Sequence, residues 1–119
     1  MTYTIVLVDD QLEFLQFARG RLTRDAALEV VGEATSGQAA LSLLEELQPD
    51  PDVVLVDVEM PGLDGFETAR RLRALAPRAR VILTSASASA HYGTAAVGIG
   101  AVFLPKRELS AQAVLDLLH

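Results

Sequence analysis

The 119-residue chain contains no cysteine, and no stretch of it is apolar over the length of a membrane-spanning helix. The lack of cysteine excludes a disulfide framework, a thiolate metal site and a cysteine nucleophile. The first four residues lack the basic charge with which a signal peptide begins. We therefore expect a soluble, cytoplasmic protein that has no contact with a membrane.

Positive charge is also scarce, with 10 lysine and arginine residues against 16 aspartate and glutamate residues and a net charge of −6. This balance argues against nucleic-acid binding by this chain alone, because such binding depends on cationic side chains that neutralise phosphates. Hydrophobic residues make up 50% of the chain and charged residues 22%, which is typical of a globular protein. The length fits one domain, which we expect to span residues 1–119.

Two apolar runs without polar interruption each end at a carboxylate. Residues 53–56 lead into Asp57, and residues 5–8 lead into Asp9 and Asp10. Such runs are typical of strands buried on both faces, as in the parallel sheet of an α/β protein. Asp57 is then expected at the carboxyl end of a central strand, where open α/β sheets bind their ligands.

Strands and helices are predicted to alternate along the whole chain. The expected strands are residues 5–8, 28–33, 53–57, 80–83 and 102–104, and the expected helices are residues 12–22, 35–47, 64–75, 88–100 and 110–118. This alternation predicts a parallel sheet with right-handed crossovers and helices on both faces. Residues 28–33 alternate most and are predicted to form an edge strand, and Leu12 and Leu75 are expected to face the core.

Two predicted helices begin with a capping-box pattern, in which a small polar residue is followed three positions later by Glu or Gln. The pairs are Thr35 with Gln38 and Asp64 with Glu67. By contrast, residues 88–100 are rich in glycine and poor in helix-forming residues. We therefore predict a short or mobile fourth helix.

Polar or charged residues follow four of the five predicted strands, and these residues are Asp9, Asp10, Asp57, Thr84, Ser85 and Lys106. Any one of them alone is explained by a helix cap, a turn or a solvated surface. The carboxyl ends of parallel strands lie at one edge of a sheet, so the residues are expected to gather there. Their combination indicates a functional site.

Three carboxylates at one place repel one another, since two unit charges about 4 Å apart interact by about 4 kcal/mol at an effective dielectric constant of about 20. A hard divalent cation such as Mg²⁺ relieves this repulsion through oxygen ligands. Asp57 then remains ionised and can attack phosphorus to give an aspartyl phosphate. Lys106 would supply positive charge and Ser85 a hydroxyl donor, because phosphoryl transfer depends on positioning and charge neutralisation.

With these residues the chain resembles, over essentially all of its length, the receiver domain of bacterial two-component response regulators. The motifs that carry the resemblance are Asp9-Asp10, the strand to Asp57 with residues 60–62 and 64–65 behind it, the hydroxyl after the fourth strand, and Phe103 with Lys106. In the stretch of residues 28–34 the chain also resembles receivers that precede a helix-turn-helix output domain. It implies a flavodoxin-like, doubly wound α/β fold with five parallel strands in the order 2-1-3-4-5 and five helices.

The resemblance implies that Asp57 is phosphorylated by a partner histidine kinase or phosphotransfer protein. Mg²⁺ would be held by Asp10, by Asp57 and by the backbone carbonyl of Glu59, with Asp9 acting largely through water. Lys106 would then meet the phosphoryl oxygens.

The resemblance also implies a switch. Ser85 is expected to be the switch hydroxyl, with Thr84 as the alternative position, and Phe103 is expected to be the switch aromatic. Phosphorylation would repack the face formed by the fourth helix, the fifth strand and the fifth helix. A homodimer that forms through this face on phosphorylation is a further implication.

The chain departs from the family pattern at the lysine, which is usually followed by proline, often across a cis peptide bond. Here Pro105 precedes Lys106 and Arg107 follows it. This departure leaves the geometry of the loop open. It also keeps a second interpretation open, in which a degenerate receiver signals by protein contact without phosphorylation.

Two other classes of function are weighed against these. A Mg²⁺-dependent phosphatase of the haloacid dehalogenase type would have a second Asp where this chain has Glu59, so we do not expect an enzyme. A flavodoxin-like cofactor binder would need a phosphate-binding glycine loop after the first strand, where Asp9 and Asp10 stand instead. No output domain is expected in this chain, which would contact DNA only through a domain outside it. The sequence is compatible both with a stand-alone receiver and with a receiver taken from a longer regulator.

Overall fold

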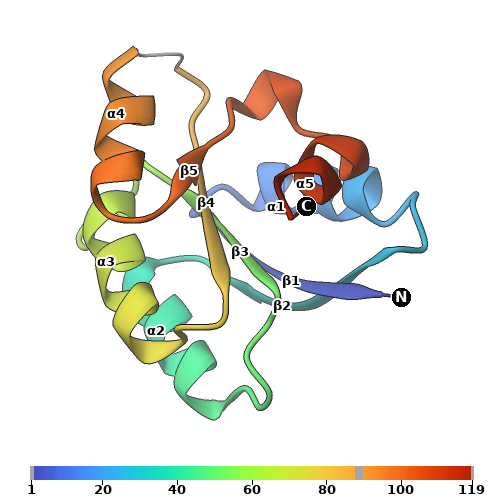
Figure 1. The fold of residues 1–119 in the computed structure, drawn as a ribbon, viewed down its shortest axis with the longest axis horizontal. Coiled ribbons are helices and arrows are strands. Elements are labelled where there is room, and N and C mark those ends of the chain that lie inside the picture. The colour runs from blue at the N-terminus through green and yellow to red at the C-terminus, as the bar shows by residue number, and fades with distance from the viewer. Residues whose placement is uncertain (1, 88–89, 119) are drawn as a thin grey trace.

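The computed structural model describes residues 2–87 and 90–118 of the chain. A five-stranded sheet in the order β2-β1-β3-β4-β5 carries helices on both of its faces, and all four strand pairs are parallel (Figure 1). The elements are β1 (Tyr3–Val8), α1 (Leu12–Leu22), β2 (Leu28–Ala34), α2 (Gly37–Glu46), β3 (Val53–Asp57), α3 (Gly65–Leu75), β4 (Arg80–Thr84), α4 (Ala90–Gly98), β5 (Val102–Phe103), the 3₁₀ helix η1 (Lys106–Glu108) and α5 (Ala111–Leu117). The predicted fold class and strand order are confirmed.

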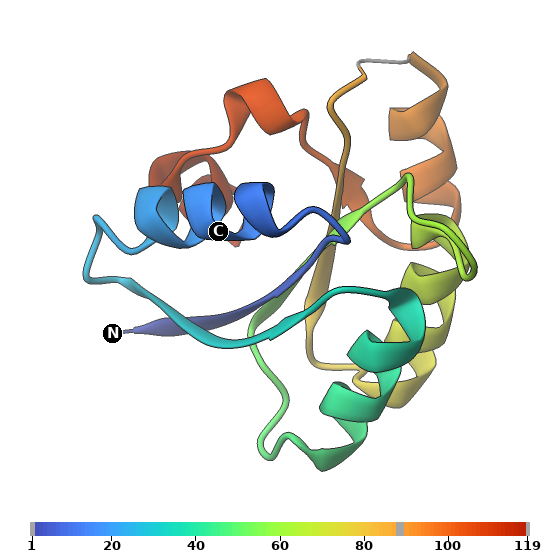
Figure 2. The ribbon, with the colours of Figure 1, turned by 180° about the vertical axis from the view of Figure 1, so that it is seen from behind.

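The strand β3 lies at the centre of the sheet, between β1 and β4. All five of its residues are buried, and burial of the four apolar residues before Asp57 is what an unbroken apolar run predicts for a strand covered on both faces. Its last residue, Asp57, stands beside Thr84, the last residue of β4. β2 occupies an edge, as its alternating sequence predicts, and Figure 2 shows it from behind.

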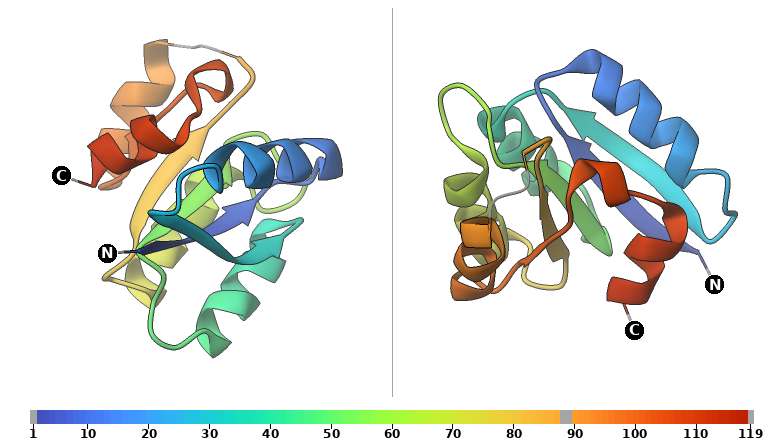
Figure 3. Two further views of the ribbon diagram at one scale, coloured as in Figure 1. Left: turned by 90° about the vertical axis from the view of Figure 1, so that its right-hand side faces the viewer. Right: turned by 90° about the horizontal axis from the view of Figure 1, so that it is seen from above.

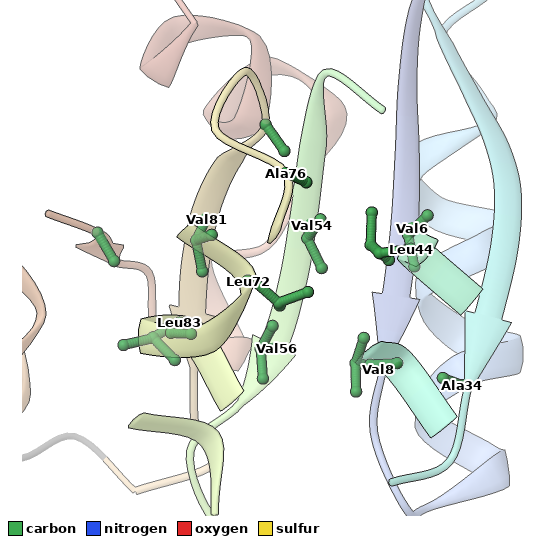
Figure 4. Close-up of a cluster of buried hydrophobic side chains, with 14 of the residues drawn as sticks. Val6, Val8, Ala34, Leu44, Val54, Val56, Leu72, Ala76, Val81 and Leu83 are labelled. Atoms are coloured by element: carbon green, nitrogen blue, oxygen red, sulfur yellow. The ribbon is translucent and has the colours of Figure 1, made fainter. Parts of the chain in front are cut away.

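Two hydrophobic clusters lie on opposite faces of the sheet. One joins the sheet to α2, α3 and α4, and Figure 4 shows its central residues, among them Val54, Val56 and Leu72. The other joins the sheet to α1 and α5 around Leu7, Leu55 and other buried residues. Figure 3 shows the resulting helix–sheet–helix layers in two further views. Since the strands are sealed from both sides, their carboxyl edge is the place where polar groups meet solvent.

The helix caps are partly as predicted. Asp64 caps α3 by accepting a hydrogen bond from Glu67 N, and Ser110 caps α5 in the same way. For α2 the predicted cap was wrong by one residue, because Ser36, and not Thr35, accepts the bond, from Ala39 N. Both neighbouring residues carry a hydroxyl that can cap a helix, and serine is the slightly preferred of the two.

The predicted inward orientation of Leu12 and Leu75 was also wrong, since these side chains are 64% and 37% exposed. Both have the helical spacing of the core-facing residues. However, Leu12 is the first residue of α1 and Leu75 is the last of α3, so they lie at the ends of the helical stripe. Helical periodicity gives the face of a residue but not whether the sheet extends beneath it.

Within the described residues, the helix α4 spans the nine residues Ala90–Gly98, and a short or mobile fourth helix stays a prediction. Residues 88 and 89 of the segment predicted as helical lie outside the described residues. Among the helices that are described, none combines the length and apolarity needed to cross a membrane.

Candidate functional site

The acidic residues gather at the carboxyl edge of the sheet, as expected. Carboxylate oxygens of Asp9, Asp10 and Asp57 lie within 4.8 Å of one another. Asp9 and Asp57 are buried, whereas Asp10 is exposed. Asp9 is fixed from two sides, because its backbone N–H donates to Ala34 O and its Oδ1 accepts from Gln11 N at 2.8 Å.

The Lys106 ammonium group lies among these carboxylates. Its Nζ atom is 2.7 Å from Oδ2 of Asp9 and 3.9 Å from Oδ2 of Asp57, and the side chain is only 13% exposed. The backbone N–H of Lys106 donates to Ser85 O at 3.0 Å, which ties the loop to the end of β4. The reversed order of proline and lysine therefore still brings the lysine to the site, as the first residue of η1.

The environment of Asp57 disfavours its charged form. Burial raises the pKa of Asp57 to about 6, with a further contribution from the charge of Asp9, while Lys106 and the N–H of Glu59 act in the opposite direction. A carboxyl group that ionises near neutral pH is typical of functional sites.

The turn beyond Asp57 is closely packed against α3. Gly65 N–H donates to Val58 O, and a Cβ atom at Gly65 would lie 2.1 Å from the carbonyl oxygen of Asp57. Val58 N–H in turn donates to Thr84 O at 2.8 Å. Glycine at position 65 is therefore required if α3 is to begin directly behind the carboxylate.

The donor set fits a hard divalent cation. Oδ2 of Asp9 is buried and, apart from the ion pair with Lys106, accepts no aligned hydrogen bond from the described residues. Three carboxylates against one ammonium group leave the cluster negatively charged. Carboxylate and carbonyl oxygens are the ligands that Mg²⁺ and Ca²⁺ prefer, so this cluster could hold such an ion.

The two candidate hydroxyls have different surroundings. Ser85 Oγ donates to Oε1 of Glu59 at 2.9 Å and accepts from Ser87 N at 3.0 Å. Thr84 Oγ1 is buried and has no hydrogen-bond partner among the described residues. The pocket over the carboxylates, of about 190 Å³, is lined by Glu59 and Ser87, both of which contact the Ser85 hydroxyl. Ser85 is thus the hydroxyl that the structure connects to the pocket.

The side chain of Phe103 lies half-buried in an aromatic row that sequence reasoning did not foresee. Its ring centroid is 5.4 Å from that of Tyr92, which is in turn 5.9 Å from that of Phe66. The row connects β5 with α4 and α3. Tyr92 was missed because the glycine-rich segment around it gave no reliable helical phase.

A second missed residue is Phe14 in α1, whose ring centroid lies 4.1 Å from Nζ of Lys106. The prediction for this helix named Leu12 as a core residue but none of the aromatic residues further along the helix. Phe14 and Phe17 are three residues apart, which is the spacing of neighbours on a helix surface, and this was the available signal.

A doubly wound sheet with carboxylates, a hydroxyl and a lysine at its carboxyl edge defines the receiver class of signalling domains. The family model described as the response regulator receiver domain matches residues 5–117. The chain therefore belongs to the response regulator receiver domain family.

Known relatives agree with this assignment. The chain is 31% identical over 116 residues to the nitrate/nitrite response regulator protein NarL of Escherichia coli, covering 98% of this chain and 53% of NarL. It is 37% identical over 109 residues to a protein-glutamate methylesterase/protein-glutamine glutaminase of Pseudoalteromonas atlantica, covering 90% of this chain and 28% of the relative. The chain thus spans about half or less of these relatives' length.

Among solved structures, the receiver domain of the putative response regulator NarL from Mycobacterium tuberculosis superposes with a TM-score of 0.86 at 35% identity. The match covers 98% of this chain and 96% of that one. A LuxR-family response regulator from Aurantimonas sp. gives a TM-score of 0.88 at 28% identity, covering 99% and 86%.

Proposed function

We propose that Asp57 is the phosphoacceptor of this receiver domain and that a histidine kinase or a phosphotransfer protein supplies the phosphoryl group. The observation that carries the proposal is the position of the Lys106 ammonium group, 2.7 Å from Asp9 and 3.9 Å from Asp57 at the carboxyl edge of the sheet. A buried cation beside two carboxylates fits the stabilisation of additional negative charge.

In this proposal an Oδ atom of Asp57 forms the bond to phosphorus while the bond from phosphorus to the donor's nitrogen or oxygen breaks. The donor group takes up the released electron pair. Lys106 neutralises charge on the phosphoryl oxygens. Ser85 turns its proton from Glu59 to a phosphoryl oxygen, since one hydroxyl donates one hydrogen bond at a time.

Mg²⁺ is the proposed cofactor, and when bound it supplies positive charge that keeps Asp57 ionised and neutralises the phosphoryl group. Asp10, Asp57 and the carbonyl of Glu59 would hold it, with Asp9 acting through water. The clustered oxygens of the three aspartates support this assignment.

The proposed output is a rearrangement of the face formed by α4, β5 and α5. Ser85 and Phe103 would act as the switch residues, and the contact of Phe103 with Tyr92 of α4 supports a route from the site to this face. A homodimer through this face, and transcription regulation through a DNA-binding domain outside this chain, extend the proposal. The LuxR-family and NarL relatives support the second extension.

The test is intact-protein mass spectrometry after incubation with acetyl phosphate, with and without Mg²⁺. We expect a gain of one phosphoryl group that requires the metal, is labile to hydroxylamine and is absent from Asp57→Asn. Asp116→Asn, which changes an exposed carboxylate in α5, is the matched control and should behave as the wild type. If neither small donors nor a kinase phosphorylate the wild type, the chain is a receiver that signals by protein contact.

A further inference from the structure

Lys106 is the only lysine of the chain. Its ammonium group has contacts beyond the carboxylates of the acidic site. Besides its two carboxylate partners, the ammonium group lies over the ring of Phe14, at 4.1 Å from the centroid. This distance is well inside the range of about 6 Å over which a cation is attracted by an aromatic face. The attraction is strongest for a desolvated cation, and this side chain is only 13% exposed.

The contact continues along α1. The ring of Phe14 lies 6.2 Å from that of Phe17, and the guanidinium group of Arg21 lies over Phe17 at 5.5 Å. The residues follow at intervals of three and four, so they form one ridge on the helix surface. Phe17 is 52% exposed, and its position between Phe14 and Arg21 gives this exposed aromatic residue a structural role.

The far end of the ridge returns to the lysine loop. Nε of Arg21 donates to the carbonyl oxygen of Leu109 at 2.5 Å. Leu109 follows η1 directly, so α1 contacts the segment from Lys106 to Leu109 at both of its ends. Between these ends, Arg107 and Glu108 are exposed, and the ion pair that joins them spans 3.9 Å.

We infer that Phe14 is a positioning residue for Lys106, and that the ridge of Phe14, Phe17 and Arg21 is a clamp on the lysine loop. In this chain no proline follows the lysine to stiffen the loop, and Pro105 precedes it. The ammonium group is held between Asp9, which attracts it, and the ring of Phe14, which it also contacts. This inference rests on the proposed function, because the clamp would hold Lys106 at the place where the phosphoryl oxygens bind.

The first experiment needs neither metal nor phosphorylation. Lysine labelled with ¹³C and ¹⁵N gives one set of side-chain signals, because the chain has a single lysine. The Phe14 ring current should shift the Lys106 ε protons upfield in the wild type, and Phe14→Leu should abolish the shift. Phe14→Trp should retain it, and Phe17→Leu should reduce it less than Phe14→Leu. An unshifted wild-type signal, or one that Phe14→Leu leaves unchanged, overturns the inference.

The second experiment measures the rate of phosphorylation by acetyl phosphate. A cation–π contact of this kind corresponds to about twofold to thirtyfold in rate, so Phe14→Leu should slow the reaction within that range and Phe14→Trp should restore it. Equal slowing in both variants would indicate a purely structural role and overturn the inference. If the wild type accepts no phosphoryl group, the proposed function fails while the lysine spectra still decide the positioning role.

Discussion

The strand β3 and the segment from α4 to β5 are built in opposite ways. All five residues of β3 are buried, and the strand pairs with β1 on one side and with β4 on the other. The edge strand β5 has two residues, Val102 is 36% exposed, and Val97 of the adjacent α4 is 71% exposed. The central strand carries Asp57, and the weakly held edge carries Phe103, the proposed switch aromatic. The proposed phosphoacceptor thus lies where the fold is most constrained, and the part proposed to move is the least constrained.

The largest expected difference between the two regions is in amide hydrogen exchange. Amides of β3 should exchange only on global unfolding, whereas those of α4 should exchange through local opening. We expect α4 amides to exchange at least about a hundredfold faster at pH 7. Native-state exchange followed by NMR measures this, and equal protection of α4 and β3 would remove the basis of the comparison.

The replacement Gly65→Ala tests how little space the central region leaves. The new Cβ would lie 2.1 Å from Asp57 O and 2.6 Å from Val58 Cα, which are backbone atoms that cannot move aside cheaply. We expect a loss of about 3 kcal/mol in the free energy of unfolding, from overpacking. Urea unfolding followed by circular dichroism measures it. A loss below about 1 kcal/mol would contradict this expectation, because it would show that the turn after β3 can shift to make room for the methyl group.

The replacement Asp57→Asn should stabilise the metal-free protein at pH 7. The folded state raises the pKa of Asp57 to about 6, well above the ordinary value of an aspartate, so ionisation costs the folded state more than the unfolded state. Wild-type stability should therefore fall as the pH rises from about 4 to about 6, by roughly 1 to 2 kcal/mol after allowance for solvent screening.

Thermal unfolding in the presence of a chelator, over this pH range, checks the prediction. The asparagine variant should lack this decrease, and Mg²⁺ should reduce the difference between the two proteins at pH 7. Parallel pH profiles for the wild type and the variant would contradict the assigned pKa.

The replacement Thr84→Val tests the unpartnered hydroxyl at the end of β4. Thr84 Oγ1 is buried without a hydrogen-bond partner among the described residues, so its removal should gain about 1 kcal/mol of stability. Ser85→Ala is the matched control, because the Ser85 hydroxyl has two partners and its loss should destabilise the protein. Chemical denaturation of both variants measures these changes in the free energy of unfolding. If Thr84→Val is destabilised, the Thr84 hydroxyl has a hydrogen-bond partner and the expectation is wrong.

The smallest expected effect is that of Gly93→Ala in α4. A Cβ atom there meets nothing within 4 Å, so the substitution gains helix propensity without a clash. We expect a stabilisation of about 0.5 to 1 kcal/mol, opposite in sign to that of Gly65→Ala. Faster exchange of the α4 amides in this variant would contradict the expectation.

The sequence was sufficient for the parts of the fold that depend on periodicity. The apolar runs that end at Asp9 and Asp57 predicted two central strands, and the parallel sheet then placed Lys106 near both. The resemblance to receiver domains added the strand order, which periodicity cannot give. These predictions succeeded because burial on both faces leaves a strong signal in residue types.

The remaining features depend on contacts between distant residues. Nothing in the spacing of Phe14 indicates that a lysine 92 positions later lies over its ring. The exposure of Leu12 depends on where the sheet ends, and the choice of Ser36 over Thr35 as a helix cap depends on one backbone conformation. Side-chain pairings of this kind follow from the assembled fold and not from local pattern.

The hydrogen bond from Ser85 to Glu59 has a consequence for how sensitive this domain is. The Ser85 hydroxyl already donates to Glu59, so an anion that is to accept this hydrogen bond at the site must displace the carboxylate first. The equilibrium then depends on the difference between two acceptors and not on the strength of either one. A weak anion in the pocket therefore leaves this hydrogen bond in place, and the proposed switch would respond only to an acceptor that binds the hydroxyl more strongly than Glu59 does.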